Sequence, residues 1–271
     1  MTRVMSSMAE IIRVGGWGLR GLGYPFGIAE RAVPLLAWTE AATGAAIRSI
    51  RLSEDEIVAS HTAPRLNQSP GTDGERRLSA HGQHLLEVGP PAADLVTADA
   101  RRHGTAALTL DGSIGSAFAP VLANMLAHRK LSGVLIFRSR PTTGEIGWLP
   151  FTQGFVTASM TLDGNDMAVP TWLERAAPMD SSKMSKLREM LDRQIHAARE
   201  AEFGHLSFIA WQCEVPPIMG PMENLCSRVT EAWRTGVETT EEDLRYLYQL
   251  ETRAWAPTSE RSRSQAGYGK F

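Results

Sequence analysis

The chain has little cysteine, no long apolar run and no excess of one charge, and each absence argues against a class of protein. Two cysteines, Cys213 and Cys226, in 271 residues cannot form a disulfide framework, so we expect a reduced, cytoplasmic protein. No apolar run approaches the roughly 18–20 residues that span a bilayer, so we expect no membrane association. The net charge of -2 lacks the basic field typical of nucleic-acid binding, so we expect no nucleic-acid partner.

Familiar catalytic and metal-binding motifs are missing as well. No glycine-rich loop has the spacing of a dinucleotide or phosphate fingerprint, and there is no nucleophile elbow. Cys213, Cys226 and His205 lack the close ligand pair that tetrahedral zinc sites usually contain. His81 and His84 have the spacing of metal ligands on one helix, but Gly82 between them argues against a helix. We therefore predict no metal site.

The patterns that are present predict an α/β fold, with a mixed sheet and flanking helices. Helical periodicity is strongest in the segment that begins at Ser181, where Ser182 is a candidate cap, and short β-rich segments alternate with helical ones. Arg65 to Arg77 is polar and rich in turn residues, which predicts an exposed connection. The predicted strands are 84–89, 105–110, 133–139, 155–162 and 205–213, and the other predicted helices are 4–22, 28–50, from Pro90, 116–129 and 241–255, with Thr239 and Thr240 as candidate caps.

A single α/β domain over residues 1–255 accounts for these elements, with a helical N-terminal portion at residues 1–50. Pro34 lies inside one predicted helix, so we expect a kink or a later helix start there. The segment from residue 256 to 271 has no apolar face, and its composition alone is typical of a disordered terminus.

Two short stretches contain residues that suit catalysis or binding. In "SHTAPR", His61 follows Ser60 and precedes Arg65; imidazole titrates near neutral pH, and a guanidinium can bind a carboxylate through two hydrogen bonds. In "DGSIG", Asp111 and Gly112 end a predicted strand, and the amides expected at the helix start near Ser116 are of the kind that binds a carboxylate or phosphate. Each pattern also has an ordinary explanation. The first is explained by a loop that follows a helix, and the second by a strand-to-helix turn that requires glycine.

Both ends of the chain resemble a bacterial family that is catalogued only as a domain of unknown function. "GYPFGIAERA" (Gly23–Ala32) is similar to its N-terminal signature, and "PTSERSR" (Pro257–Arg263) is similar to its closing signature. The resemblance implies that the family covers nearly the whole chain. It also implies that the tail docks on the body, with Trp255 anchoring it to the core and with Ser259 and Arg263 reaching a ligand pocket or a subunit contact.

The middle of the chain resembles the malate/L-lactate dehydrogenase-like family, whose members bind nicotinamide cofactors without a classical Rossmann domain. The family's S-H-G-x-x-R is similar to Ser60–Arg65 with threonine for glycine, and its D-G-x-x-G-x-G is similar to Asp111–Gly115 but departs at Ala117. Its R-N-S-N-H-F-G agrees with "RSRPTTG" only at Arg138 and Gly144, and Thr142 stands where its second histidine would be. Asp166-Met167-Ala168 is similar to its D-M-A. The segment before this motif, which binds the cofactor in that family, is too short in this chain.

The second resemblance implies a small-molecule enzyme that acts on a small carboxylate, most simply an oxidoreductase-like scaffold with an altered site. It also implies a homodimer and makes NAD or NADP the expected cofactor, although the sequence itself leaves the cofactor unknown. A hydrolase or lyase of a small cyclic or carboxylate substrate, with or without a metal, and a non-catalytic binding or partner protein with a decayed site stay open. The implied catalytic residues are His61, Arg65 and Ser60, and the implied substrate-binding residues are Asp111, Gly112, Gly115, Ser259 and Arg263.

Overall fold

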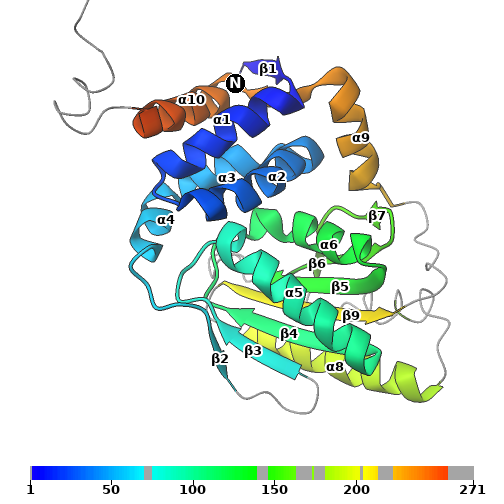
Figure 1. Cartoon of the computed structure of the whole chain (residues 1–271). Coiled ribbons are helices and arrows are strands. Elements are labelled where there is room, and N and C mark those ends of the chain that lie inside the picture. The colour runs from blue at the N-terminus through cyan, green and yellow to red at the C-terminus, as the bar shows by residue number, and fades with distance from the viewer. Residues whose placement is uncertain are drawn as a thin grey trace, which may run out of the picture.

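The computed structural model describes residues 2–69, 75–138, 146–162, 173, 181–201, 204–212 and 222–255. Two parts make up the architecture: a group of helices from both ends of the chain, and a mixed sheet with helices on both faces (Figure 1). One continuous hydrophobic core joins these parts, from Ile11 and Leu36 in the helical group to Leu108 and Phe208 in the sheet.

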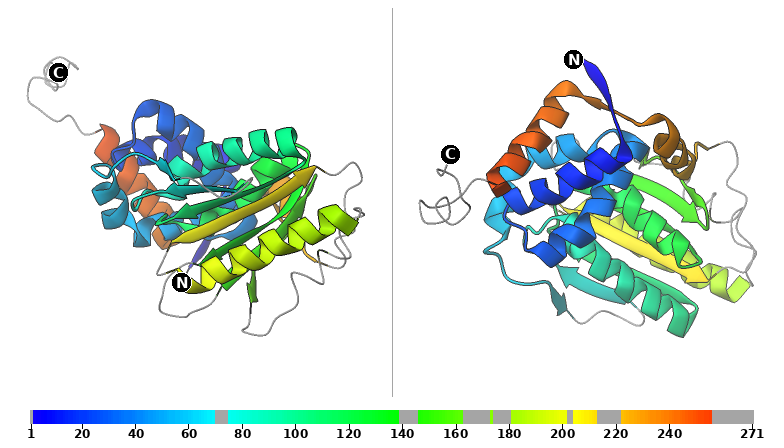
Figure 2. Two further views of the ribbon diagram at one scale, coloured as in Figure 1. Left: turned by 90° about the horizontal axis from the view of Figure 1, so that it is seen from below. Right: turned by 45° about the horizontal axis from the view of Figure 1, so that its top comes forward.

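The helical group combines the first third of the chain with its last described segments. α1 (Met8–Gly21), α2 (Phe26–Thr43), α3 (Ala46–Leu52) and α4 (Glu54–Ser60) follow one another, and α10 (Glu241–Trp255) packs against α1 (Figures 1 and 2). α9 (Leu225–Thr235) leads into β10 (Val237–Thr240), which pairs antiparallel with β1 (Arg3–Ser6). The helical N-terminal portion thus runs on to Ser60, beyond the expected limit at residue 50, and also contains a short strand.

The main sheet is mixed, as predicted, in the order β2-β3-β4-β9-β5-β6-β7, with β8 also on β6. β3 and β4 run parallel, whereas the other described pairs in this sheet are antiparallel. The strands are β2 (Asn67–Ser69), β3 (Glu75–Ser79), β4 (Thr105–Asp111), β5 (Leu131–Arg138), β6 (Ile146–Thr152), β7 (Phe155–Val156), β8 (Met160–Leu162) and β9 (His205–Gln212).

Helices cover both faces of the sheet, which is why its central strands are buried throughout. α5 (Leu85–His103) and α6 (Ala119–His128), preceded by the short 3-10 turn η1 (Ser116–Phe118), cover one face, and α8 (Ser181–Glu200) covers the other (Figure 2, left). Under α8 lies a second, smaller hydrophobic cluster that includes Ile136, Trp148 and Trp211. None of the helices in the described ranges is long and apolar enough to cross a membrane.

Several predicted elements are confirmed by the structure. α8 begins at Ser181, β4, β5 and β9 lie where strands were expected, and α10 spans Glu241–Trp255. The hydroxyl of Thr240 accepts a hydrogen bond from the amide of Asp243 at 3.1 Å, which is the expected cap of α10. The predicted helix over 116–129 is present as η1 followed by α6.

The strand predicted at residues 84–89 is wrong, because this segment is the first part of α5. His84 caps the helix, since its Nδ1 accepts a hydrogen bond from the amide of Leu86 at 3.1 Å. Pro90 lies inside α5 and does not begin it. Leu85, Val88 and Ala92 form one buried helical stripe, and burying this stripe outweighs the local preference of proline for a helix start.

Four other segments differ from the sequence predictions. The helix predicted over 4–22 begins only at Met8, because Arg3–Ser6 form β1, which pairs with β10. The helix predicted over 28–50 starts earlier, at Phe26, runs through Pro34 and ends at Thr43, where Gly44 adopts a left-handed conformation with φ 65° before α3. The predicted strand 155–162 is two short strands, β7 and β8. The expected exposed connection from Arg65 to Arg77 contains β2 and the start of β3.

Candidate functional site

The loop "SHTAPR" follows α4, and its three predicted catalytic residues do not share one surface. Ser60 is buried, and its hydroxyl donates to the carbonyl of Ile57 at 2.7 Å. His61 is exposed, and its Nε2 lies 2.9 Å from the carbonyl oxygen of Leu22. Arg65 is exposed as well. Only Ser60 lines a described cavity, so the catalytic roles of His61 and Arg65 stay predictions that this geometry does not carry.

A second feature is formed at the carboxyl ends of the parallel strands β3 and β4. The loop after β3 is hydrogen-bonded to the loop after β4: the amide of Ala80 donates to the carbonyl of Asp111 at 2.8 Å, and that of Gly82 to Gly112 at 2.7 Å. His81 adopts φ 50°, a left-handed conformation that is uncommon for a residue with a side chain. In parallel α/β sheets, ligands bind beyond the carboxyl ends of the strands, and β3 and β4 are the parallel pair among the described strands of this sheet.

Between these loops and helices α3 and α4 lies a cavity of about 690 Å³, which we call the Ser60 cavity. It brings together two residues of the predicted site, Ser60 and Gly115, although they are far apart in the sequence. Its polar and glycine lining consists of Ser49, Ser53, Glu56, Ser60, His81, Gly82, Gly115 and Ser116.

A neighbouring hollow contains the other two described residues of the predicted substrate site, Asp111 and Gly112. It shares His81 and Gly82 with the Ser60 cavity, so the two spaces meet at this loop. We call it the Asp111 hollow, and its other lining residues include Arg77, Ser79 and Glu200.

Both oxygens of Asp111 already have protein partners. Oδ2 accepts from Nε of Arg77 at 2.6 Å, and Oδ1 lies 2.9 Å from Nδ1 of His205. Burial pushes the pKa of Asp111 up, but the hydrogen bonds from His205 and Arg77 outweigh it and hold this pKa below its ordinary value. Asp111 is therefore a carboxylate at neutral pH, fixed at the edge of the hollow.

The chain Asp111–His205–Ser207 has the order of a hydrolytic triad but not its accessibility. Nε2 of His205 lies 2.8 Å from the hydroxyl of Ser207, which donates to Oε1 of Gln194 at 2.6 Å. Ser207 is 0% exposed and lies between the sheet and α8. A nucleophile must reach its substrate, so this network holds α8 to the sheet and fixes Asp111.

Gly115 has a structural reason to be glycine. It adopts φ 86°, and a Cβ there would lie 2.2 Å from Nε2 of His84. His84 is completely buried, and burial lowers its pKa to about 3. Since Nδ1 of His84 accepts the amide of Leu86, the neutral ring carries its proton on Nε2, which has no hydrogen-bond partner within the described ranges.

His81 is the residue of this site that the sequence reasoning did not select. Its spacing from His84 suggests only a shared metal site, and the structure separates the two residues, because His84 is a buried helix cap whereas His81 is exposed in the loop. No group of three or more potential metal ligands occurs among the described residues. The signal that points to His81 is a histidine-glycine pair directly after a strand.

Several predicted residues cannot be placed. Ser259, Arg263 and the rest of the tail, Asp166–Ala168 and Cys213 lie outside the described residues. Trp255, the last residue described, is 61% exposed and packs against Trp17, with ring centroids 4.6 Å apart and the rings tilted by 45°. The expectation that Trp255 anchors the tail in the core is therefore wrong, because its ring packs on the surface.

A nicotinamide dinucleotide needs partners for its two phosphates, supplied by cationic side chains or clustered backbone amides. The described lining of the Ser60 cavity contains no lysine or arginine and one carboxylate, Glu56. The helix start at this cavity is the three-residue turn η1, which offers no full helical N-terminus. The described residues of this cavity therefore do not fit a dinucleotide.

No family model matches the chain, and no curated protein matches its sequence. Similarity to the uncharacterised bacterial family thus stays a prediction. Solved structures do match. Malate dehydrogenase from Pyrococcus horikoshii OT3 is 12% identical, with a TM-score of 0.65 over 94% of this chain and 97% of that chain.

Two other matching structures agree with this one. Sulfolactate dehydrogenase from Methanocaldococcus jannaschii is 12% identical, with a TM-score of 0.63 over 93% of this chain and 98% of its own. Delta1-piperideine-2-carboxylate reductase from Pseudomonas syringae is 14% identical, with a TM-score of 0.58 over 91% and 99%. At these identities the likeness establishes the architecture alone: the chain has the malate/L-lactate dehydrogenase-like fold.

Proposed function

We propose that this chain is an oxidoreductase-like enzyme that acts on a small carboxylate in the Ser60 cavity. The observation that supports this most directly is the position of the cavity beyond the carboxyl ends of β3 and β4, in a fold shared with dehydrogenases and a reductase. The cavity volume of about 690 Å³ is within the range of small-molecule sites.

In this proposal, His81 moves only the proton; the hydride would be exchanged with a nicotinamide cofactor held outside the described lining of the Ser60 cavity, which does not fit a dinucleotide. Its imidazole is exposed at the junction of the two spaces, where it can act as a general acid or base at a carbonyl or hydroxyl oxygen. The hydroxyl of Ser60 donates to Ile57, so it offers its lone pairs to a substrate hydroxyl. Arg77 is 62% exposed and its guanidinium can take a substrate carboxylate at the neighbouring hollow.

The test compares His81→Gln with His128→Gln, a matched control at an exposed histidine at the end of α6. Purified variants are assayed with a panel of 2-oxo acids, 2-hydroxy acids and cyclic imino acids, each with NADH, NADPH or their oxidised forms. We expect His81→Gln to reduce kcat by about 100-fold or more, as loss of a general acid does, and His128→Gln to leave it unchanged. Equal activity of the two variants would exclude His81.

His61→Gln belongs in the same experiment because it tests the role that the resemblance implies. If His61→Gln loses activity and His81→Gln does not, the site lies at the "SHTAPR" loop and the assignment to the Ser60 cavity fails. Arg65→Gln then shows whether the carboxylate clamp lies there too, through a rise in KM.

A second candidate is a non-catalytic binding protein with a decayed site. Two observations favour such a protein. The ring of His61 lies against the carbonyl of Leu22, and the described lining of the Ser60 cavity has no cationic side chain. Binding of a small carboxylate in calorimetry, with no turnover under any cofactor, is the result expected of such a protein. A hydrolase or lyase gains no support from the matching structures, and the buried Ser207 offers no nucleophile.

We also propose that the protein forms a homodimer, by analogy with the family that the sequence resembles. Light scattering coupled to size-exclusion chromatography measures the mass directly. A mass near that of one 29.6 kDa chain at micromolar concentration would contradict the dimer and leave the assignment of the cavity untouched.

A further inference from the structure

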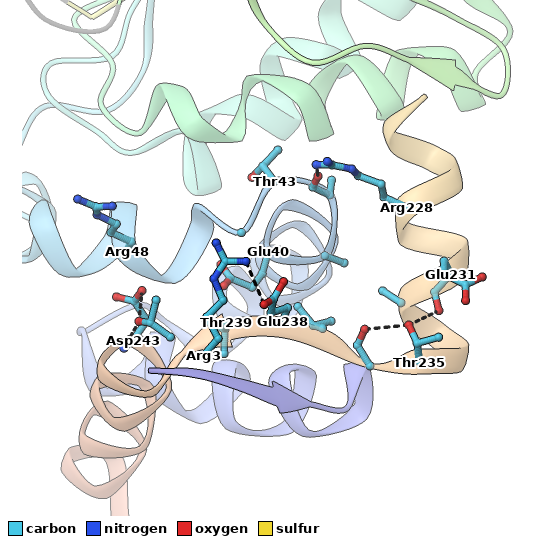
Figure 3. Close-up of a pocket in the computed structure, with 17 residues that line it drawn as sticks. Arg3, Glu40, Thr43, Arg48, Arg228, Glu231, Thr235, Glu238, Thr239 and Asp243 are labelled. Carbon is cyan, nitrogen blue, oxygen red and sulfur yellow. Dashed lines mark hydrogen bonds and ion pairs between the residues drawn. The ribbon is translucent and has the colours of Figure 1, made fainter. Parts of the chain in front are cut away.

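A second pocket of about 690 Å³ lies in the helical group, and its lining shares no residue with the Ser60 cavity. It is formed where α2 ends, α3 begins and the β1–β10 ribbon crosses below α9 (Figure 3). We call it the Glu40 pocket, after the buried carboxyl group in its wall.

The wall of this pocket contains two buried polar side chains that protein atoms only partly satisfy. Glu40 is 1% exposed; its Oε2 accepts the amide of Ile47 at 3.0 Å, whereas its Oε1 has no hydrogen-bond partner in the described chain. Thr239 on β10 is 4% exposed; its hydroxyl lies beside the carboxyl group of Glu40, whose pKa it lowers, but it meets no partner in hydrogen-bonding geometry in the described chain. Buried polar atoms without partners are rare in folded proteins, and each requires an explanation.

The two groups in the wall determine which ligand groups suit it. Burial raises the pKa of Glu40, the nearby carboxylate of Asp243 acts in the same direction, and the hydrogen bond from Ile47 and the hydroxyl of Thr239 offset this only in part. The carboxyl group of Glu40 accepts a hydrogen bond in either protonation state, and the hydroxyl of Thr239 can donate or accept one. Such a wall matches ligand hydroxyl groups, which both donate and accept.

The lining contains three arginines and four carboxyl groups: Arg3, Arg48, Arg228, Glu40, Glu231, Glu238 and Asp243. Two of the arginines stand in exposed ion pairs. Arg3 pairs with Glu238 at 2.9 Å, and Arg228 pairs with Glu223 at 2.5 Å while also donating to the carbonyl of Ala42. In both ion pairs the side chains are about half exposed or more, so each pair contributes little to the stability of the fold. A ligand anion can therefore replace the glutamate as the partner of either arginine. Figure 3 shows Arg3 rising from β1 and Arg228 reaching in from α9 toward the end of α2.

We propose that the Glu40 pocket binds a small hydroxylated anion. Its hydroxyl groups would bond to Glu40 and Thr239, and its phosphate or carboxylate would bind Arg3 and Arg228, whose planar guanidinium groups suit either anion. The ligand would join α2, α9 and the β1–β10 ribbon, elements from the two ends of the chain. This site is independent of the proposed reaction in the Ser60 cavity.

Calorimetric titrations with four probes test the proposal on the full-length protein. Glycerol 3-phosphate and glycerate carry both kinds of group, whereas glycerol lacks the anion and inorganic phosphate lacks the hydroxyls. We expect glycerol 3-phosphate or glycerate to bind. Glycerol and inorganic phosphate, which each carry only one of the two kinds of group, should bind at least tenfold more weakly. Binding of phosphate alone with the same affinity would indicate an adventitious ion only, and binding of neither complete probe would overturn the proposal.

Variants then locate the binding. Thr239→Val keeps the shape of the side chain and removes a hydroxyl that meets no described partner in hydrogen-bonding geometry, so we expect unchanged or higher thermal stability and about fivefold weaker binding. Arg3→Gln should weaken binding about tenfold, whereas Arg234→Gln, on α9 but outside the lining, should not. Amide shifts must appear at Gly44 and Gly236 on titration. Shifts confined to Gly82 and Gly115, or full affinity in Thr239→Val, would refute this site while leaving the proposed function standing.

Discussion

His84 should make the stability of this protein fall on mild acidification, and His84→Asn should remove that effect. The imidazole is 0% exposed and packs edge-on against Phe118. Its Nδ1 already accepts the amide of Leu86, so protonation would turn this acceptor into a donor facing another donor. Asparagine is a favourable cap residue with its own acceptor oxygen and does not titrate.

The magnitude follows from the difference in proton binding between the folded and unfolded states. Burial lowers the pKa of His84 to about 3 from its ordinary 6.5. The unfolded chain therefore binds a proton as the pH falls below 6.5 while the folded chain does not, so the unfolding free energy decreases in this window. From about pH 8 to about pH 5 one such group costs about 2 kcal/mol. This figure depends mainly on the unfolded pKa, because the folded ring is still neutral at about pH 5.

Urea unfolding followed by the fluorescence of the seven tryptophans measures both proteins at a series of pH values. Removing the ring leaves a gap beside Phe118, so His84→Asn will be less stable than the wild type at about pH 8 by an amount that does not depend on pH. We expect this difference to shrink by about 2 kcal/mol at about pH 5. If the two stability curves stay parallel over this range, His84 titrates normally in the folded protein and the reasoning is wrong.

Three further predictions concern other groups in the structure. Gly115→Ala should lower the unfolding free energy by about 2–4 kcal/mol, because its Cβ would meet His84. Gly82→Ala is the control, since Gly82 has a similar φ of 84° and open space around it, and it should lose only about 1–2 kcal/mol. Equal losses in chemical denaturation would show that contact with His84 is unimportant. Burial raises the pKa of Glu40 above its ordinary 4.5, so the unfolding free energy falls as the pH rises through the folded pKa, and the stability of Glu40→Gln relative to the wild type should increase with pH above 4.5. A difference that stays constant with pH would contradict this. Ser207→Ala should lower the unfolding free energy by about 1–3 kcal/mol, because it leaves His205 and Gln194 without their shared partner. Any enzymatic activity should persist in this variant. Complete loss of turnover in the folded variant would make Ser207 catalytic.

The sequence predicts those elements best in which local pattern and tertiary burial agree. The apolar stripe of α8 and the β-rich segments of β4, β5 and β9 are clear in the sequence, and each is buried as its pattern indicates. At α5 the two signals conflict. The apolar run from Leu85 and the following Pro90 favour a strand and a new helix locally, but one continuous helix buries more of the stripe against the sheet. Single-residue preferences cannot predict that outcome.

The site was predicted less well than the fold, because spacing in the sequence does not report which way a side chain points. Ser60 and His61 are adjacent, yet Ser60 is buried and lines the cavity, whereas His61 is exposed and lies outside that lining. Gly115 joins Ser60 in the same cavity because β4 and α4 end at the same place, which no local pattern contains. His81 becomes a candidate only when the left-handed loop after β3 is known.

The "DGSIG" motif has two reasons to contain glycine, of which the sequence suggests only one. Its glycines suggested close approach of a ligand to the backbone, and Gly112 and Gly115 do line the two candidate spaces. Yet Gly115 is also required to be glycine by the buried ring of His84, which lies where its Cβ would be. The same turn therefore packs the cap of α5 on one side and forms the cavity wall on the other. A ligand that binds here would contact a loop whose conformation is set by core packing, so the binding surface exists before the ligand arrives.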